Sequence, residues 1–177
     1  MSVMGQMHIH PRLECSRRII QLATRRRLFA ADELRDLTVE IAAQTEVWQP
    51  LIRYTAEKRW YEALILSDAL ELWLIGWAPG QATPIHDHGG AAGALTIAAG
   101  RLVETVHTYP RLIRPRRITH GDGARAAFAP HHIHRVANES AANAASIHAY
   151  SPAGLEMRLY DDSGQALLVG AGSAAAR

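Results

Sequence analysis

The spacing of apolar residues divides the chain into a helical first third and a strand-rich remainder. From roughly Arg12 to Trp48, apolar side chains recur at mixed three- and four-residue steps, which is typical of amphipathic helices. Ala31-Asp32-Glu33 is expected to start one of these helices, and Pro50 interrupts the pattern. A further short helix is predicted from Glu57 to about Ile65, so the helical N-terminal part spans about residues 12–66.

Beyond about Ala69 the chain consists of short apolar runs separated by glycine, proline and aspartate. The expected strands are Leu70 to Trp77, Gly93 to Ala99, Leu102 to Thr108, Arg117 to His120, Ala124 to Ala129, His132 to Asn138, Ala145 to Tyr150 and Glu156 to Tyr160. Such spacing is typical of antiparallel strands in a barrel or sandwich. With no internal repeat or linker, we predict one mainly β domain over residues 1–177, with the barrel at about 70–160 and a flexible tail at 163–177.

Length and composition indicate an ordinary globular protein. A chain of 177 residues can bury a sizeable core without disulfides, and its 48% hydrophobic and 20% charged residues lie in the globular range. There is no run of eighteen apolar residues and no signal-peptide pattern, so we expect a cytoplasmic protein without a membrane partner. The single cysteine, Cys15, supports neither an internal disulfide nor a thiolate metal site.

The charge distribution is uneven, although the formal net charge is only +2. Arginines crowd the N-terminal segment: Arg12, Arg17, Arg18, Arg25, Arg26 and Arg27. Such a cluster could attract nucleic acid or an anionic surface, but a solvated helix face explains it as well. We therefore do not expect a nucleic-acid partner, and the sequence does not indicate an oligomeric state.

Histidines carry the main chemical signal. Successive side chains of a strand point to opposite faces, so His86 and His88 can both point inward and bind a single ion. His134 follows in a later strand, where it can complete a site of three imidazoles inside a barrel. His8 and His10 have the same spacing, but they lack the surrounding glycines and lie near a terminus, so we expect no metal there.

The residues around these histidines resemble the two signatures of the cupin superfamily. Gly80, His86, His88, Gly93 and Gly100 resemble the first signature, with Gly93 in the position that is usually a glutamate. Gly123 through Pro130, His134 and Asn138 resemble the second signature, although the gap between the proline and the histidine is one residue short. This resemblance implies His86, His88 and His134 as metal ligands. His131 and His132 remain alternatives to His134, and strand alternation puts His132 on the same face; we prefer His134 because Asn138 follows it at the signature spacing. His107 and His120 are expected on the surface or in loops, and Asp87 as a structural acceptor.

An all-histidine ligand set followed by Ser146-x-His148-x-Tyr150 narrows the resemblance from the cupin superfamily to one family within it. About half of the chain, from about Leu70 to Tyr160, resembles the cysteine dioxygenase family of thiol dioxygenases. The matching residues are Trp77, Pro84 through Gly90, Gly100, His134 through Asn138, and Ser146 through Pro152. The resemblance implies a cupin-type antiparallel β-barrel or sandwich preceded by N-terminal α-helices. It also implies one non-haem iron(II) per chain and the oxidation of a small carboxylated thiol, such as cysteine or 3-mercaptopropionate, by O2 to a sulfinic acid.

Three imidazole ligands alone do not identify the metal ion, because imidazole binds zinc, copper, iron and nickel alike. Three facial ligands leave up to three positions on an octahedral ion for a bidentate substrate and dioxygen, whereas tetrahedral zinc leaves one. A coordinating thiol binds as the thiolate. Without a carboxylate ligand the iron stays more positive, which favours an anionic sulfur ligand.

The resemblance also assigns roles to the catalytic row. Ser146 would fix the tautomer of His148, His148 would orient the Tyr150 hydroxyl, and that hydroxyl would bond the bound oxygen or the substrate carboxylate. The alternative is that these three residues are buried polar side chains whose hydrogen bonds only stabilise the core. Some family members crosslink this tyrosine to a cysteine at the position of Gly93, so no crosslink is expected, and the glycine is expected to leave room beside the metal.

Substrate anchoring departs from the family pattern. Family members place an arginine or glutamine in a Tyr-x-Arg or Tyr-x-Gln stretch, whereas this chain reads Arg59-Trp60-Tyr61. We predict Arg59 as the anchor of the substrate carboxylate, with Tyr61 assisting, because a guanidinium binds a carboxylate in a bidentate fork. An ordinary surface arginine is the alternative.

Two other functions fit parts of the sequence. The generality of the cupin signatures allows another metal-dependent cupin enzyme, against which the row from Ser146 to Tyr150 argues. The arginine-rich N-terminal segment allows a non-catalytic ligand-binding or regulatory cupin, which salt-sensitive nucleic-acid binding would favour.

Overall fold

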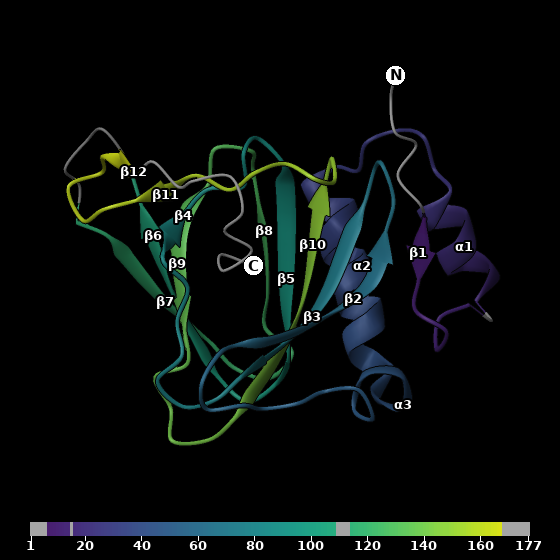
Figure 1. The fold of residues 1–177 in the computed structure, drawn as a ribbon, viewed down its shortest axis with the longest axis horizontal. Helices are drawn as coiled ribbons and strands as arrows, with labels where there is room; N and C mark the ends of the chain where they lie inside the picture. The colour runs from purple at the N-terminus through teal and green to yellow at the C-terminus, as the bar shows by residue number, and fades with distance from the viewer. Residues whose placement is uncertain (1–6, 15, 109–113, 168–177) are drawn as a thin grey trace.

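Two antiparallel sheets and three short helices make up the computed structural model, which describes residues 7–14, 16–108 and 114–167 (Figure 1). The helices are α1 (Arg17–Ala23), α2 (Ala31–Ala43) and α3 (Thr45–Trp48). The strands are β1 (His8–Ile9), β2 (Trp60–Leu66), β3 (Glu71–Trp77), β4 (Ile85–His86), β5 (Ala92–Ala99), β6 (Leu102–His107), β7 (Arg116–His120), β8 (Arg125–Phe128), β9 (Ile133–Ala137), β10 (Ala144–Ser151), β11 (Leu159–Tyr160) and β12 (Ala166–Leu167). The predicted mainly β architecture with N-terminal helices is confirmed.

Strands distant in the sequence are neighbours in both sheets. One sheet has the order β1-β2-β3-β10-β5-β8, and the other has the order β12-β11-β4-β9-β6-β7. All eight strand segments expected between Leu70 and Tyr160 contain a strand, although the last shrinks to β11. The arrangement brings β4 and β9, which carry histidines of the predicted site, into direct pairing.

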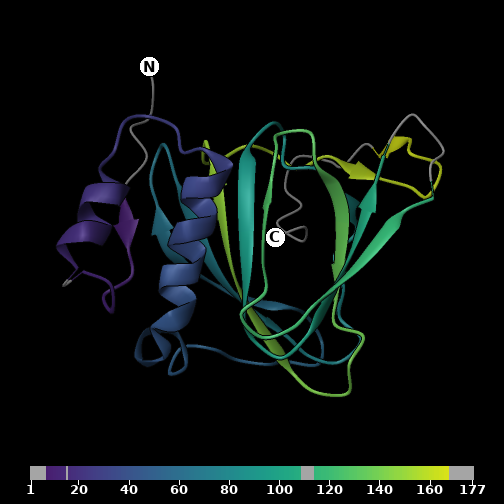
Figure 2. The same cartoon turned by 180° about the vertical axis from the view of Figure 1, so that it is seen from behind.

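The central strands of the first sheet, β3, β10 and β5, are largely buried on both faces because helices cover their outer side. Figure 2 shows α2 lying across this sheet, where it packs against β5, β8 and β10. Side chains of β10 alternate between the two faces. Ala145, Ile147 and Ala149 belong to the core cluster under the helices, which leaves Ser146, His148 and Tyr150 for the other face. The helical layer thus supplies the apolar packing that lets polar side chains face the interior.

The helix predicted from Glu57 to Ile65 is wrong, because this stretch forms β2 instead. β2 pairs antiparallel with β3, with a bulge between Ala63 and Ile65. Both Leu64 and Ile65 are fully buried at this irregularity. Pairing along β3 outweighs the helix propensity of the alanine and leucines, since strand formation depends more on neighbouring strands than on local preference.

The N-terminal arginines lie on a solvated surface and form several ion pairs. Arg18 lies 3.0 Å from Glu40, while Arg25 and Arg27 lie 3.2 and 2.6 Å from Glu33. As predicted, α2 begins at Ala31. Among the described residues, no helix has the length and apolar character needed to span a membrane. Cys15 and the last ten residues of the predicted tail, 168–177, lie outside the described residues.

Candidate metal centre and catalytic row

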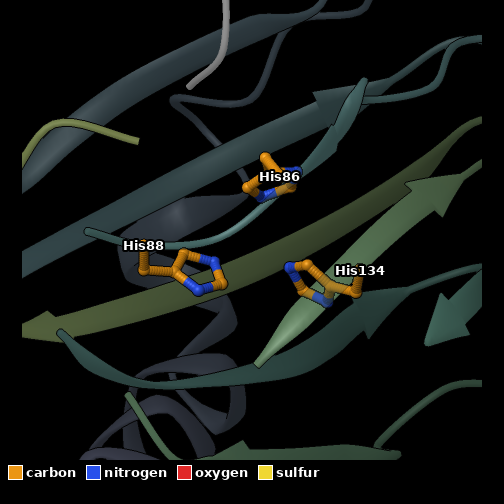
Figure 3. Close-up of side chains that lie close together, drawn as sticks. All are labelled: His86, His88 and His134. Carbon is orange, nitrogen blue, oxygen red and sulfur yellow. The ribbon is translucent and has the colours of Figure 1, made fainter. Parts of the chain in front are cut away.

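Three buried histidines converge in the interior, and Figure 3 shows their rings turned toward a common space. His86 ends β4 and lies opposite His134 of β9 in the strand register, while His88 follows two residues after His86. Their ring centroids are 4.8 to 5.1 Å apart. One ligand atom from each lies within 4.8 Å of the others, so the predicted trio is brought together in a geometry that suits one ion. Among described residues, no such group includes His8 or His10.

The hydrogen bonds of the three rings test whether a metal fits. His86 Nδ1 lies 3.0 Å from the carbonyl oxygen of Pro84, so this nitrogen carries the hydrogen and Nε2 can bind an ion. Both ring nitrogens of His88 are buried, and neither has a hydrogen-bond partner within the described part of the chain. Buried polar atoms normally have a partner, and a metal ion would supply the missing one. The donor set therefore fits a metal.

Burial also keeps these rings in the neutral form that binds metal. It lowers the pKa of His86 to about 3 and holds the pKa of His88 well below its ordinary value. Burial lowers the pKa of His134 as well, against the raising effect of its hydrogen bond to Glu104. Since a metal binds the neutral imidazole, the site needs no proton loss near neutral pH.

A carboxylate behind the site was not predicted. Glu104 of β6 is 2% exposed and lies 2.8 Å from His134 Nδ1. His132, one of the alternative ligands, lies outside the trio and contacts Glu104 at 2.8 Å. His120, expected at the surface or in a loop, is instead buried at the end of β7, with Nε2 2.9 Å from Glu104. Strand alternation puts Glu104 on the same face as the buried Leu102, but only the pairing of β6 with β7 and β9 brings the histidines to it.

The predicted row forms a continuous hydrogen-bonded chain on β10. Ser146 Oγ lies 2.9 Å from His148 Nε2, and His148 Nδ1 lies 3.1 Å from Tyr150 Oη. Trp77 extends the chain, because its Nε1 donates to Ser146 Oγ at 2.9 Å. Burial lowers the pKa of His148 to about 3, so a neutral ring with one N–H connects the two hydroxyl groups.

Gly93 lies between Tyr150 and Phe128 in the strand register. The room expected beside the metal is filled: a Cβ on Gly93 would lie 2.1 Å from Phe128 Cε2. The Phe128 ring also stacks on His88, with centroids 4.8 Å apart, and Tyr150 stacks on His88 at 4.9 Å. Two aromatic rings therefore hold the His88 ring, for which the described residues offer no hydrogen bond.

We expect Gly93→Ala to destabilise the fold, because the added methyl group displaces the Phe128 ring. Overpacking of this kind costs about 1–3 kcal/mol, which thermal unfolding would detect. Gly121→Ala is the matched control, since a Cβ there meets nothing within 4 Å. Combining Gly93→Ala with Phe128→Leu should recover part of the loss. Equal stability of Gly93→Ala and wild type would contradict the crowding.

A pocket beside the histidines contains both predicted substrate-binding residues. Its walls include Arg59, Tyr61, Trp73, Trp77, His86, His134, His148 and Tyr150. The Arg59 guanidinium lies 4.9 Å from the centroid of the Trp77 ring, and its Nη1 donates to the carbonyl oxygen of Ala82 at 3.2 Å. Arg59 is thus a pocket residue, which disfavours the surface alternative. Because an arginine stays charged, the pocket has a fixed cation near the metal candidates.

Two further motif residues have structural roles. The Asp87 carboxylate is buried and accepts hydrogen bonds from Arg158 Nε at 2.8 Å and Tyr160 Oη at 2.7 Å, as a structural acceptor should. It lies outside the ligand groups found among the described residues. Asn138 donates to the carbonyl oxygens of Trp77 and Ala142 at 3.0 and 2.8 Å. Both residues stabilise the loops that position the histidines.

The chain has the fold of a cupin superfamily protein, and its buried histidines fit a metal ion. A protein from Thermus thermophilus is 26% identical over 59% of this chain and 92% of its own, with a TM-score of 0.52. A cupin superfamily protein from Desulfitobacterium hafniense is 18% identical over 59% of this chain and 86% of its own, with a TM-score of 0.50. Comparison with curated protein sequences finds no match. The model of the family "Cysteine dioxygenase type I" matches residues 11–163, so this chain belongs to that family.

Proposed function

We propose that this protein is an iron(II)-dependent thiol dioxygenase acting on a small carboxylated thiol of the cysteine or 3-mercaptopropionate type. The main support is one pocket that joins two candidate ligands, His86 and His134, to the Arg59 guanidinium and the Tyr150 hydroxyl. Both atoms of O2 enter the product, so R–SH + O2 → R–SO2H balances without a further reductant. The product is a sulfinic acid.

His86, His88 and His134 would hold one metal ion per chain. Iron(II), when bound there, would bind the thiolate and supply the redox chemistry for its reaction with dioxygen. The protein side chains would exclude water and align the thiol, because aromatic rings line the pocket and Phe128 and Tyr150 enclose His88.

The hydrogen bonds of the catalytic row all run in one direction, which the donor groups along the row determine. Ser146 Oγ accepts from the Trp77 N–H, and its own buried hydroxyl hydrogen then has His148 Nε2 as acceptor. His148 consequently carries its hydrogen on Nδ1 and donates it to Tyr150 Oη. Tyr150 can therefore direct its own O–H toward the reacting atoms, where a fixed donor stabilises developing negative charge.

An oxygen electrode with iron-loaded protein and a panel of thiols tests this proposal. We expect uptake with cysteine or 3-mercaptopropionate, one sulfinate per O2 by mass spectrometry, and weak uptake with cysteamine, which lacks a carboxylate. Zinc-loaded protein is the control and should be inactive. Iron-loaded protein that converts no thiol would contradict the function and favour another metal-dependent cupin activity, or a regulatory role if the protein binds nucleic acid in a salt-sensitive manner.

We expect Arg59→Met to raise the KM for a carboxylated thiol by roughly 10- to 100-fold. A hydrogen bond to a charged group is worth about 1.5–3 kcal/mol, and methionine cannot replace it. The KM for cysteamine should not change, because that thiol offers no carboxylate. Arg101→Met, at an exposed arginine, is the control. Equal KM increases for both thiols would show that Arg59 only maintains the pocket.

A further inference from the structure

Glu104 has three histidine partners and a buried carboxylate. Its Oε1 lies 2.8 Å from both His134 Nδ1 and His132 Nε2, and its Oε2 lies 2.9 Å from His120 Nε2. The partners come from β7, β9 and the residue just before β9. Glu104 on β6 lies between these strands, since β6 pairs with both β7 and β9.

The three contacts have hydrogen-bond geometry and fix the hydrogens of all three rings. Ring nitrogens face both carboxylate oxygens, two at Oε1 and one at Oε2, and hydrogen bonds from three N–H groups favour the ionised form of Glu104. An ionised carboxylate only accepts hydrogen bonds, so each facing nitrogen must donate. The neutral His134 ring then carries its hydrogen on Nδ1, and its Nε2 can bind the metal.

The charge of Glu104 has no guanidinium or ammonium partner in the described part of the chain, where its ion pairs are with histidines only. A buried carboxylate is costly unless a positive charge lies nearby. A divalent ion on His134 would provide that charge. The trio of His86, His88 and His134 consists of imidazoles alone, and one hydrogen bond to His134 joins the Glu104 carboxylate to it. Glu104 also forms a second group with metal-ligand spacing, together with His132 and His134.

We infer that Glu104 is a positioning residue of the metal site, which orients His134 and supplies through it the negative charge that the ligands lack. His120 and His132 hold the carboxylate in place. This inference rests on the proposed metal site but not on the identity of the thiol. A carboxylate bonded to a ligating histidine raises the basicity of the ring and typically changes metal affinity by about 10- to 100-fold.

Co²⁺ binding to the metal-free protein, without any thiol, tests this role. We expect Glu104→Gln to bind Co²⁺ about 10- to 100-fold more weakly and to shift the visible absorption of the bound ion, because the amide keeps the shape but not the charge. Glu104→Asp, which keeps the charge, should recover part of the affinity. Glu139→Gln is the matched control, since that exposed carboxylate pairs with Arg117 at 2.7 Å.

The possible outcomes of Co²⁺ binding distinguish a failure of the Glu104 role from a failure of the metal site. If the wild type binds no Co²⁺, the metal site fails and the role of Glu104 fails with it. If the wild type binds Co²⁺ and Glu104→Gln has the same affinity and spectrum, only the role of Glu104 is overturned. A second Co²⁺ per chain that is lost in Glu104→Gln would also overturn it, since the carboxylate would then be a ligand. If Glu104→Gln does not fold, His120→Phe should weaken Co²⁺ binding roughly 3- to 10-fold, and unchanged affinity overturns the inference.

Discussion

His86→Ala is expected to lose both the bound iron and the thiol turnover. The substitution leaves two imidazoles, and alanine offers no atom that can bind a metal. Iron per chain after anaerobic loading and oxygen uptake with the best thiol measure the effect. Both should fall to the level of buffer.

His8→Ala is the control for this prediction, because His8 belongs to the other His-x-His pair and lies on the exposed edge strand β1. It should bind as much iron as the wild type. Circular dichroism must show that His86→Ala is folded. A folded His86→Ala protein that retains iron and turnover would mean that the three histidines do not form the metal site.

The sequence was sufficient for features that depend on local periodicity. His86 and His88 lie two residues apart, and both rings turn toward the same space even though β4 ends at His86. The row from Ser146 to Tyr150 lies on one strand, so alternation alone places these side chains on the same face. These predictions needed no knowledge of which strands are neighbours.

Features that depend on strand pairing were missed. Leu64 and Ile65 belong to a strand because β3 lies beside them, and no local pattern shows this. Glu104 meets His120 and His134 because β6 lies between β7 and β9. The ring of Phe128 covers Gly93 because β8 pairs with β5. In each case a contact between distant segments decides the environment of the residue.

Tyr150→Phe is expected to lower kcat by about 100- to 1,000-fold while the iron content stays unchanged. Removal of one fixed donor near developing charge has effects of this size. The phenylalanine ring can still stack on His88, as Tyr150 does at 4.9 Å, so the metal candidates should keep their positions. Turnover and iron content of the same preparation test this separation.

A substitution further along the chain distinguishes a relay from a row of buried polar residues that only stabilise the fold. Ser146→Ala removes the acceptor of the Trp77 N–H and the donor to His148, so the tautomer of His148 is no longer held. We expect a smaller loss of kcat than for Tyr150→Phe, because Ser146 acts on the Tyr150 hydroxyl only through His148. Tyr54→Phe, at a partly exposed tyrosine outside the pocket, should keep full turnover. If Ser146→Ala and Tyr150→Phe both lower the melting temperature but leave kcat of the iron-loaded protein unchanged, the row is structural and the proposed donor role of Tyr150 is wrong.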